Sequence, residues 1–363
     1  MKANTFSTKM EYPQWVVIQL MEHCNLRCSM CYEWGENGSY PGKKELASLD
    51  FKVLEKTILE LRPARPFFGL FGGEPFLYRQ IGDVIRLIKE GGSKVDIPTN
   101  GMLIAKKAEM LVETQPNRLW ISLDGPEEIN DRQRGQGVFR SVMEGIDRLH
   151  KVREAKNSRY PKIGVTFIVT PLTYPYIEEF FLNCLDLSRI EHLSIEFQTY
   201  ITEEKHRDYT KVLQRDFGIE KAPIAAGSIQ YPADFAAMDY ASIVRQINKV
   251  REVCDQRGIY FVAYPKTTEQ NNVRNYFTAN WKEMTDKRAM CLFPWVYTEI
   301  AATGEVSVCH TFYDMPLGNI NEHSLLDIRR GEPIQQARNY LRKNGLFPIC
   351  TGCARYYADP SKH

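Results

Sequence analysis

The sequence lacks several features that would place the protein in a special class. It has no apolar run long enough to span a membrane and no charged-then-apolar signal peptide at its start. Its charges nearly cancel, with 47 Lys and Arg against 45 Asp and Glu, so the net charge of +2 provides no strong field for a polyanion. No repeat or low-complexity segment is present. We therefore expect a cytoplasmic protein with neither a membrane nor a nucleic-acid partner.

A disulfide framework is also not expected. The nine cysteines are odd in number and clustered, and cytosolic thiols stay reduced or bind metal. The 363 residues are 43% hydrophobic and 25% charged, which is typical of a globular protein. This length suggests one large domain and a smaller one.

Three of the cysteines lie close together near the start of the chain. Cys24, Cys28 and Cys31 have the spacing C-x3-C-x2-C and directly follow the apolar run WVVIQL at 15–20. Three thiolates can hold three irons of a 4Fe–4S cluster and leave the fourth iron open to a small molecule. A structural zinc site needs four ligands, and His23 is a candidate for the fourth, so the spacing alone leaves zinc open.

A second motif, GGEP at 72–75, follows the short apolar run FGLF at 68–71. Two glycines allow the backbone to approach a ligand closely, and Glu74 offers a carboxylate to an ammonium group. The alternative is a tight turn that leaves the Glu74 side chain in solvent.

In spacing and order these motifs resemble the radical S-adenosylmethionine (SAM) superfamily. The resemblance implies that the open iron chelates the amino and carboxylate groups of SAM, and that an electron from the cluster cleaves SAM to methionine and a 5′-deoxyadenosyl radical. The segment SLDGP at 122–126 also matches, with Asp131 and Arg134 downstream. In the family the serine of this segment reaches the SAM ribose and the arginine pairs with the SAM carboxylate; the alternative is that Asp124 and Arg134 only brace the loop. The resemblance implies the SAM-binding residues Met30, Gly72, Gly73, Glu74, Asn100, Ser122 and Arg134.

The first two hundred residues alternate between strand-like and helix-like runs. Strands are expected at 15–20, 67–71, 94–97, 118–123, 162–170 and 192–198, with helices at 49–61, 78–91, 104–115, 138–154 and 174–186. This alternation predicts an α/β fold with a parallel sheet, and six units match the partial (β/α)6 barrel of the superfamily. The chemistry would lie at the carboxyl ends of the strands. We divide the chain into a barrel at 12–202, a linker or covering segment at 203–286 and a small C-terminal domain at 287–357.

Four more cysteines lie in the C-terminal region. Cys291 and Cys309 flank two apolar runs around a Gly turn, which predicts a β-hairpin that brings them together. Cys350 and Cys353 are a C-x2-C pair that can complete a four-thiolate shell. Taken alone, this set suits zinc as well as a cluster.

The region resembles the SPASM/twitch extensions that follow many radical SAM barrels. Cys291, Gly304 and Cys309 fit their C-x(9–15)-G-x4-C opening, as does the LGNI run at 317–320. Full SPASM domains carry further cysteines, which are lacking after Cys353. We therefore expect one auxiliary 4Fe–4S cluster on Cys291, Cys309, Cys350 and Cys353, with zinc as the alternative.

The resemblance predicts a radical SAM oxidoreductase or transformase in which the radical abstracts hydrogen from the substrate and the auxiliary cluster accepts an electron. Only about fourteen residues precede the first strand, so we expect no N-terminal peptide-recognition domain and favour a small molecule such as a sugar or cyclitol. The alternatives are modification of a ribosomal peptide or protein, and a non-catalytic metal-binding module. The expected electron donor is a flavodoxin or ferredoxin. No residue is assigned as a general base.

Overall fold

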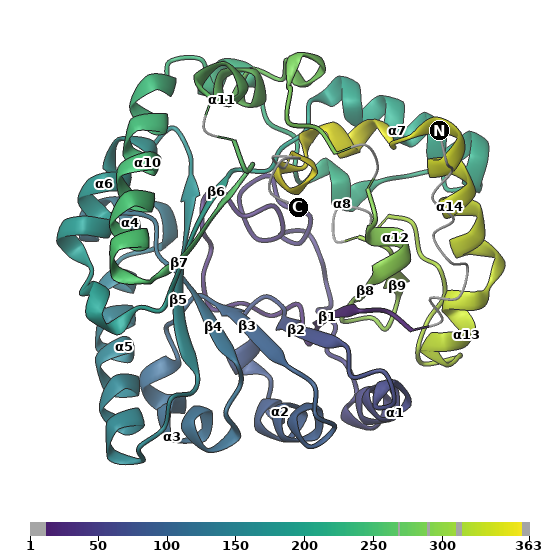
Figure 1. Ribbon diagram of the computed structural model, residues 1–363. Coiled ribbons are helices and arrows are strands. Elements are labelled where there is room, and N and C mark those ends of the chain that lie inside the picture. The colour runs from purple at the N-terminus through teal and green to yellow at the C-terminus, as the bar shows by residue number, and fades with distance from the viewer. Residues whose placement is uncertain (1–11, 268, 289–290, 310–313, 358–363) are drawn as a thin grey trace.

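The computed structural model describes residues 12–267, 269–288, 291–309 and 314–357. Its centre is one nine-stranded sheet with the strand order β7-β6-β5-β4-β3-β2-β1-β8-β9. Strands β7 through β8 are parallel, and only β9 is antiparallel to its neighbour. The sheet curves into an arc that does not close, and helices cover its outer side (Figure 1). The strands are β1 Trp15–Gln19, β2 Phe67–Phe71, β3 Val95–Thr99, β4 Arg118–Ser122, β5 Lys162–Val169, β6 His192–Phe197, β7 Tyr260–Tyr264, β8 Tyr297–Ile300 and β9 Val306–Ser307.

The two faces of the sheet follow the two-residue period of its strands. In β1, Val16 and Ile18 are fully buried toward the helices, whereas Trp15 and Val17 line a cavity on the concave face. The outer side of the sheet is apolar beneath the helices, whereas the strand residues on the concave face are both apolar and polar. The concave face therefore supplies the walls of any internal site.

The covering helices are amphipathic. In α1, Phe51–Leu61, Asp50 caps the N-terminus by accepting hydrogen bonds from the backbone N–H groups of Lys52 and Val53, and one face of the helix is buried. The other helices are α2 Ile81–Glu90, α3 Ile104–Thr114, α4 Glu127–Arg134, α5 Val138–Ala155, α6 Ile177–Glu179, α7 Glu203–Phe217, α8 Pro223–Ala226, α9 Pro232–Phe235, α10 Tyr240–Arg257, α11 Gln270–Phe277, α12 Phe293–Val296, α13 Leu325–Arg330 and α14 Glu332–Asn344. No helix in the described residues is both long and apolar enough to cross a bilayer.

One helix differs from the sequence expectation. The segment 174–186 is not a single α-helix: it begins with a 3-10 turn, continues as the short α6 and ends in the π-helical turn Phe180–Cys184. The wider turn is accompanied by burial of two consecutive aromatic side chains, Phe180 and Phe181, which both pack on Phe167 of β5.

The sheet runs through all three segments into which we divided the chain. The segment 203–286 contributes β7, and the C-terminal segment contributes β8, which pairs with β1 in the register Val17 to Glu299. The hairpin expected between Cys291 and Cys309 is present as β8 and β9. The C-terminal segment is thus continuous with the barrel sheet.

Candidate functional site

The first three cysteines lie on the loop that leaves β1 at its carboxyl end. Their thiols are close enough to influence one another: burial raises the pKa of Cys24 to about 11, the backbone N–H of Leu26 opposes this rise, and Glu74, Cys28 and Cys31 add to it. Three partly buried thiols with raised pKa values are costly to ionise alone. Cationic irons would stabilise all three thiolates, so this donor set fits an iron–sulfur cluster.

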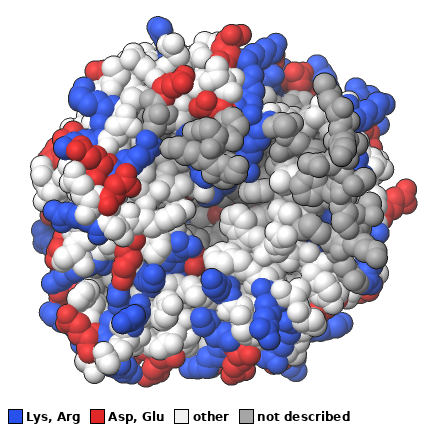
Figure 2. Space-filling model, in the orientation of Figure 1, with Lys and Arg blue, Asp and Glu red and all other residues white. Residues whose placement is uncertain are grey.

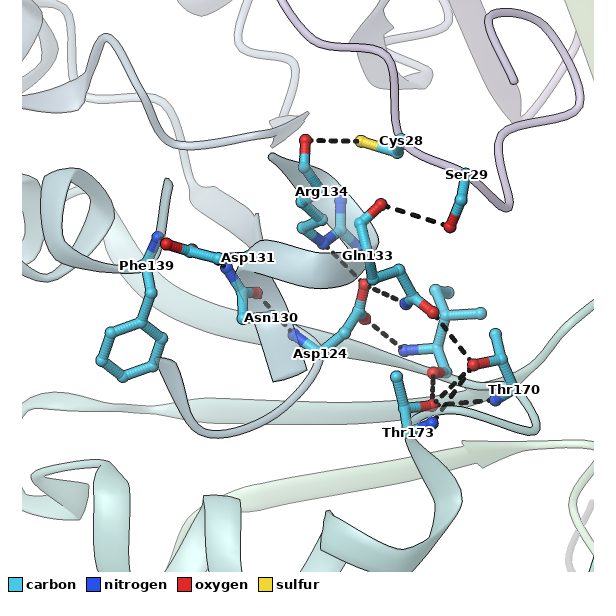
Figure 3. Close-up of polar contacts among 11 residues, drawn as sticks. Cys28, Ser29, Asp124, Asn130, Asp131, Gln133, Arg134, Phe139, Thr170 and Thr173 are labelled. Atoms are coloured by element: carbon cyan, nitrogen blue, oxygen red, sulfur yellow. Dashed lines mark hydrogen bonds and ion pairs between the residues drawn. The ribbon is translucent and has the colours of Figure 1, made fainter. Parts of the chain in front are cut away.

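The cysteine loop is fastened to the segment after β4 (Figure 3). The backbone N–H of Ser29 donates to the carbonyl of Gln133 at 2.9 Å, and the Cys28 thiol lies 3.9 Å from the carbonyl of Arg134. Arg134 in turn forms a 2.6 Å ion pair with Asp124, which has no exposed surface. The Asp124 carboxylate also accepts hydrogen bonds from the Gln133 side chain at 2.6 Å and from a β5 backbone N–H at 2.7 Å. Asp124 and Arg134 therefore brace the loop, whatever else Arg134 binds.

The two glycines of the GGEP motif are required by packing against the cysteine loop. A Cβ at Gly73 would lie 2.2 Å from the carbonyl oxygen of His23, and one at Gly72 would lie 2.6 Å from that of Met21. The close approach that the structure shows at these glycines is to the loop backbone, and their approach to a ligand stays a prediction.

Glu74 is fully buried, so the alternative of a solvent-exposed turn residue is wrong. Its carboxylate accepts hydrogen bonds from Thr99 Oγ1 and the Asn100 N–H, both at 2.9 Å, and from the Phe76 N–H at 3.1 Å. A carboxylate has about four acceptor positions, of which these donors fill three; contact of Glu74 with a ligand ammonium group stays a prediction. Burial raises the pKa of Glu74 to about 7, and these three donors oppose the rise.

The other predicted SAM contacts lie around the same edge of the sheet. The Asn100 side chain donates to Asn25 at 2.8 Å and lies 3.9 Å from the Cys24 sulfur. Ser122, at the carboxyl end of β4, lines the large cavity, and Met30 is partly buried in the cysteine loop. Contact of these residues with SAM stays a prediction.

The concave face of the sheet encloses a cavity of about 740 Å³, which lies within the range of small-ligand sites. Figure 2 shows that the molecule is hollowed near the middle of the face in view, with positive and negative side chains interspersed around it. The walls are rich in aromatic rings and carry a few charged groups. These include Asp96, Arg118, Glu196, Glu299 and Arg355.

The four C-terminal cysteines surround a smaller cavity of about 40 Å³. Burial raises the pKa of Cys350, and Cys291, Cys309 and Cys353 add to the rise, so all four thiols are neighbours. Within the described residues, no three His, Cys, Asp or Glu side chains are arranged to hold a single metal ion. Four thiols around a space provide the donor set of either a cluster or a zinc ion, as the sequence also left open.

Two buried glutamates, Glu299 and Glu33, were not identified from the sequence as site residues. Glu299 of β8 is fully buried and accepts a hydrogen bond from the Tyr297 hydroxyl, and burial raises the pKa of its carboxyl well above the ordinary value. Glu33 accepts a hydrogen bond from Gln19 at 2.9 Å, and burial raises its pKa to about 8. A glutamate within the apolar run VYTEI was the only signal in the sequence for Glu299.

Polar side chains near the ends of other segments differ in whether they reach the large cavity. Tyr200 is fully buried and donates to the carbonyl of Phe277 at 2.9 Å, and Asp314 accepts hydrogen bonds from the first turn of α8. Tyr264 does line the large cavity. His310 and Tyr313 lie outside the described residues.

Two family models match the sequence. The radical SAM superfamily model matches residues 18–160, and SPASM, an iron-sulfur cluster-binding domain, matches residues 291–354. A "tungsten-containing aldehyde ferredoxin oxidoreductase cofactor-modifying protein" of Pyrococcus furiosus is 25% identical over 94% of this chain and 87% of its own length. A "GTP 3′,8-cyclase" of Limosilactobacillus fermentum is 35% identical, but only over 36% of this chain and 40% of its own length.

Solved structures share the fold over nearly the whole chain. SuiB of Streptococcus suis with bound S-adenosylmethionine has a TM-score of 0.65 at 18% identity, covering 96% of this chain and 77% of that protein. The protein anSMEcpe with bound S-adenosylmethionine has a TM-score of 0.58 at 16% identity, covering 95% of this chain and 90% of that protein. The TM-scores and coverage show a shared fold, and at identities below 20% the comparison shows the fold alone.

Proposed function

Because this chain is a radical SAM enzyme with a C-terminal SPASM domain, binding SAM and iron–sulfur clusters, we propose that it abstracts a hydrogen atom from a substrate held in the 740 Å³ cavity. One observation carries the proposal: the Gly72–Gly73 turn packs on the backbone of the cysteine loop, and Tyr32 of that loop and Ser122 of β4 both line this cavity. The bound cluster and SAM together supply the 5′-deoxyadenosyl radical.

The residues of this chain orient and enclose the site. Cys24, Cys28 and Cys31 hold the cluster, and the Asp124–Arg134 pair fixes the loop that carries them. Glu74 holds the Asn100 turn in place and offers its remaining acceptor position to the SAM ammonium group. Ser122 faces the cavity, where it would contact the SAM ribose.

The second cysteine set would hold the cluster that accepts an electron from the substrate. In the overall balance, one hydrogen atom leaves a substrate C–H bond and forms 5′-deoxyadenosine. A net two-electron oxidation would need one more electron and one proton to leave the substrate. A cluster held by Cys291, Cys309, Cys350 and Cys353 would supply the electron acceptor, and water or a base would take the proton. Cys291, Cys309, Cys350 and Cys353 fill all four ligand positions, so the substrate does not bind that cluster directly.

We propose a peptide or protein side chain as the substrate, in place of the small molecule that the sequence favoured. Structures of the same fold have been solved with a precursor peptide or another peptide bound. The partly open cavity, with the rings of Trp15, Trp120 and Tyr260 along its wall, suits a side chain that enters from outside.

Anaerobic reconstitution tests the chemistry. Iron and sulfide are counted per chain for the wild type and for a Cys24→Ala/Cys28→Ala/Cys31→Ala triple variant, and each is reduced with SAM present. We expect about eight irons in the wild type, about four in the variant, and 5′-deoxyadenosine from the wild type alone. Zinc without iron, and no nucleoside, would contradict the proposal.

The substrate class is tested in the same assay. Short peptides encoded beside the gene are added to the reduced enzyme, with sugars and cyclitols in parallel. We expect a peptide to increase 5′-deoxyadenosine formation and to lose 2 mass units. If only a sugar or cyclitol increased 5′-deoxyadenosine formation, the result would support a small-molecule substrate instead of a peptide.

A further inference from the structure

One charged residue lies in the wall between the two cavities. Arg355 lines both the 740 Å³ cavity and the 40 Å³ cysteine cavity, and among the charged residues it alone is common to the two walls in the described structure. Arg288 lines only the cysteine cavity, and Arg118 only the large one. The guanidinium of Arg355 is therefore placed to act on both sites.

The position of Arg355 is fixed from both sides. Its guanidinium carbon lies 4.4 Å from the centre of the Tyr264 ring, and its Nη2 lies 3.4 Å from Glu196 Oε1. Its backbone N–H is directed at Cys353, two residues earlier in the chain. These contacts hold a positive charge against one ligand of the auxiliary site.

The partner carboxylate belongs to the substrate side. Glu196 lies on β6 and lines the large cavity but not the cysteine cavity, and its side chain is 26% exposed. An occupant of the cavity can therefore reach Glu196, while Arg355, which lines the same cavity, also reaches the cysteines.

The sign of each charge effect follows from electrostatics. Reduction adds an electron to a cluster that already carries four thiolates, so a nearby cation stabilises the reduced form and a nearby anion destabilises it. Arg355 thus favours electron acceptance, and Glu196 opposes it from a greater distance.

We propose that Arg355 raises the reduction potential of the auxiliary cluster, and that Glu196 makes this effect depend on what occupies the large cavity. A cationic group of the substrate, such as an ammonium or guanidinium, would neutralise Glu196 and make the cluster a better acceptor once the substrate is bound. The inference rests on the proposed function, because it requires a cluster on the four C-terminal cysteines.

The test measures the midpoint potential of the auxiliary cluster alone. The Cys24→Ala/Cys28→Ala/Cys31→Ala variant, which retains only that cluster, is titrated with a reductant and followed by electron paramagnetic resonance. Arg355→Gln, Glu196→Gln and the double variant are compared in this background. Arg118→Gln is the matched control, because Arg118 forms a 2.7 Å ion pair with Asp96 in the same large cavity.

We expect Arg355→Gln to lower the equilibrium constant for one-electron reduction of the auxiliary cluster about tenfold, which lowers its midpoint potential by about 59 mV. Glu196→Gln, which imitates a neutralised carboxylate, should raise the potential by a smaller amount, and the double variant should lie between the two. Arg118→Gln should leave it unchanged. The midpoint potential of Arg355→Lys, which keeps the positive charge, should stay near the starting value. This variant also shows whether the site tolerates substitution.

Two results would overturn the inference: an Arg355→Gln shift no larger than that of Arg118→Gln, or a lower potential in Glu196→Gln. A background variant that binds no iron would instead overturn the proposed auxiliary cluster, and is recognised by the iron count before any potential is measured.

Discussion

At the scale of single residues, Asp124 joins three parts of the site: Arg134, Gln133 and the backbone of β5. Asp124→Asn removes the charge that compensates buried Arg134, so we expect a loss of about 3 kcal/mol or more in the free energy of unfolding. The urea midpoint of unfolding measures this loss.

Glu127→Gln is the control: it removes the exposed partner of Arg140 and should change the urea midpoint little. The iron content of Asp124→Asn should fall at the first cluster only, because Gln133 and Arg134 hold the loop of Cys28; equal loss at both clusters would contradict this role.

His192 gives a pH dependence that can be isolated. Burial lowers its pKa from 6.5 to about 4, and Arg118 and Lys162 add to the shift. Between these two values the unfolded chain binds a proton that the folded chain does not, so this contribution to stability is lost as the pH falls from about 6.5 to about 4. His192→Gln should reduce the drop in urea midpoint between pH 7.0 and pH 5.5. An equal drop in both proteins would mean that other groups cause it.

The sequence was most informative about residues whose spacing carries chemistry. The seven cysteine positions predicted two sites, and the structure brings each set together. The sequence was uninformative about Glu299 and Arg355, because strand pairing between distant segments decides whether a single charged side chain faces a cavity. Gly72 and Gly73 were recognised as sites of close approach, but only the fold shows that they pack against the loop after β1.

At the scale of elements, the turn between β8 and β9 determines whether Cys291 and Cys309 meet. Gly304 in this turn has φ +87°, and a Cβ there would lie 2.3 Å from the Asn321 amide nitrogen, which donates to the carbonyl of Thr303. Gly304→Ala should lower the free energy of unfolding by more than the ~1 kcal/mol of a strained backbone alone, and should reduce iron at the auxiliary site.

Gly345 is the matched control for that turn. It has φ +81° but open space where its Cβ would be, so Gly345→Ala should cost only the backbone strain and leave the iron content unchanged. Equal iron loss in the two variants would show that the turn is not specific to the auxiliary site.

Most barrel elements were predictable because the apolar period changes cleanly between strand and helix. The predicted and observed bounds of β2 coincide, and those of α3 and α5 agree within one residue. The prediction of a single helix at 174–186 was wrong, because the burial of adjacent Phe180 and Phe181 against β5 is a tertiary effect.

At the scale of the whole molecule, the C-terminal segment is part of the barrel sheet. Removing residues 287–363 would take β8 from β1 and expose an apolar strand edge. We expect such a chain to aggregate and to lack the first cluster as well as the second. Soluble expression and iron content measure this. A soluble truncated chain with about four irons would show that the barrel folds independently.

The sequence could not predict this arrangement. We divided the chain into a barrel, a linker and a small domain from the order of its motifs. The pairing of β8 with β1 and the addition of β7 to the sheet depend instead on three-dimensional contacts. No local pattern in residues 297–300 identifies β1 as their neighbour.

The β1–β8 pair also sets an order of events during synthesis. Trp15 and its partner Tyr297 are separated by about 280 residues, so at roughly 5–20 residues per second the first strand waits about 15 to 60 s for its last neighbour. The cysteine loop leaves the ribosome at the start of that interval. Cluster assembly factors therefore have access to Cys24, Cys28 and Cys31 while one side of β1 is still open, and oxygen has the same access.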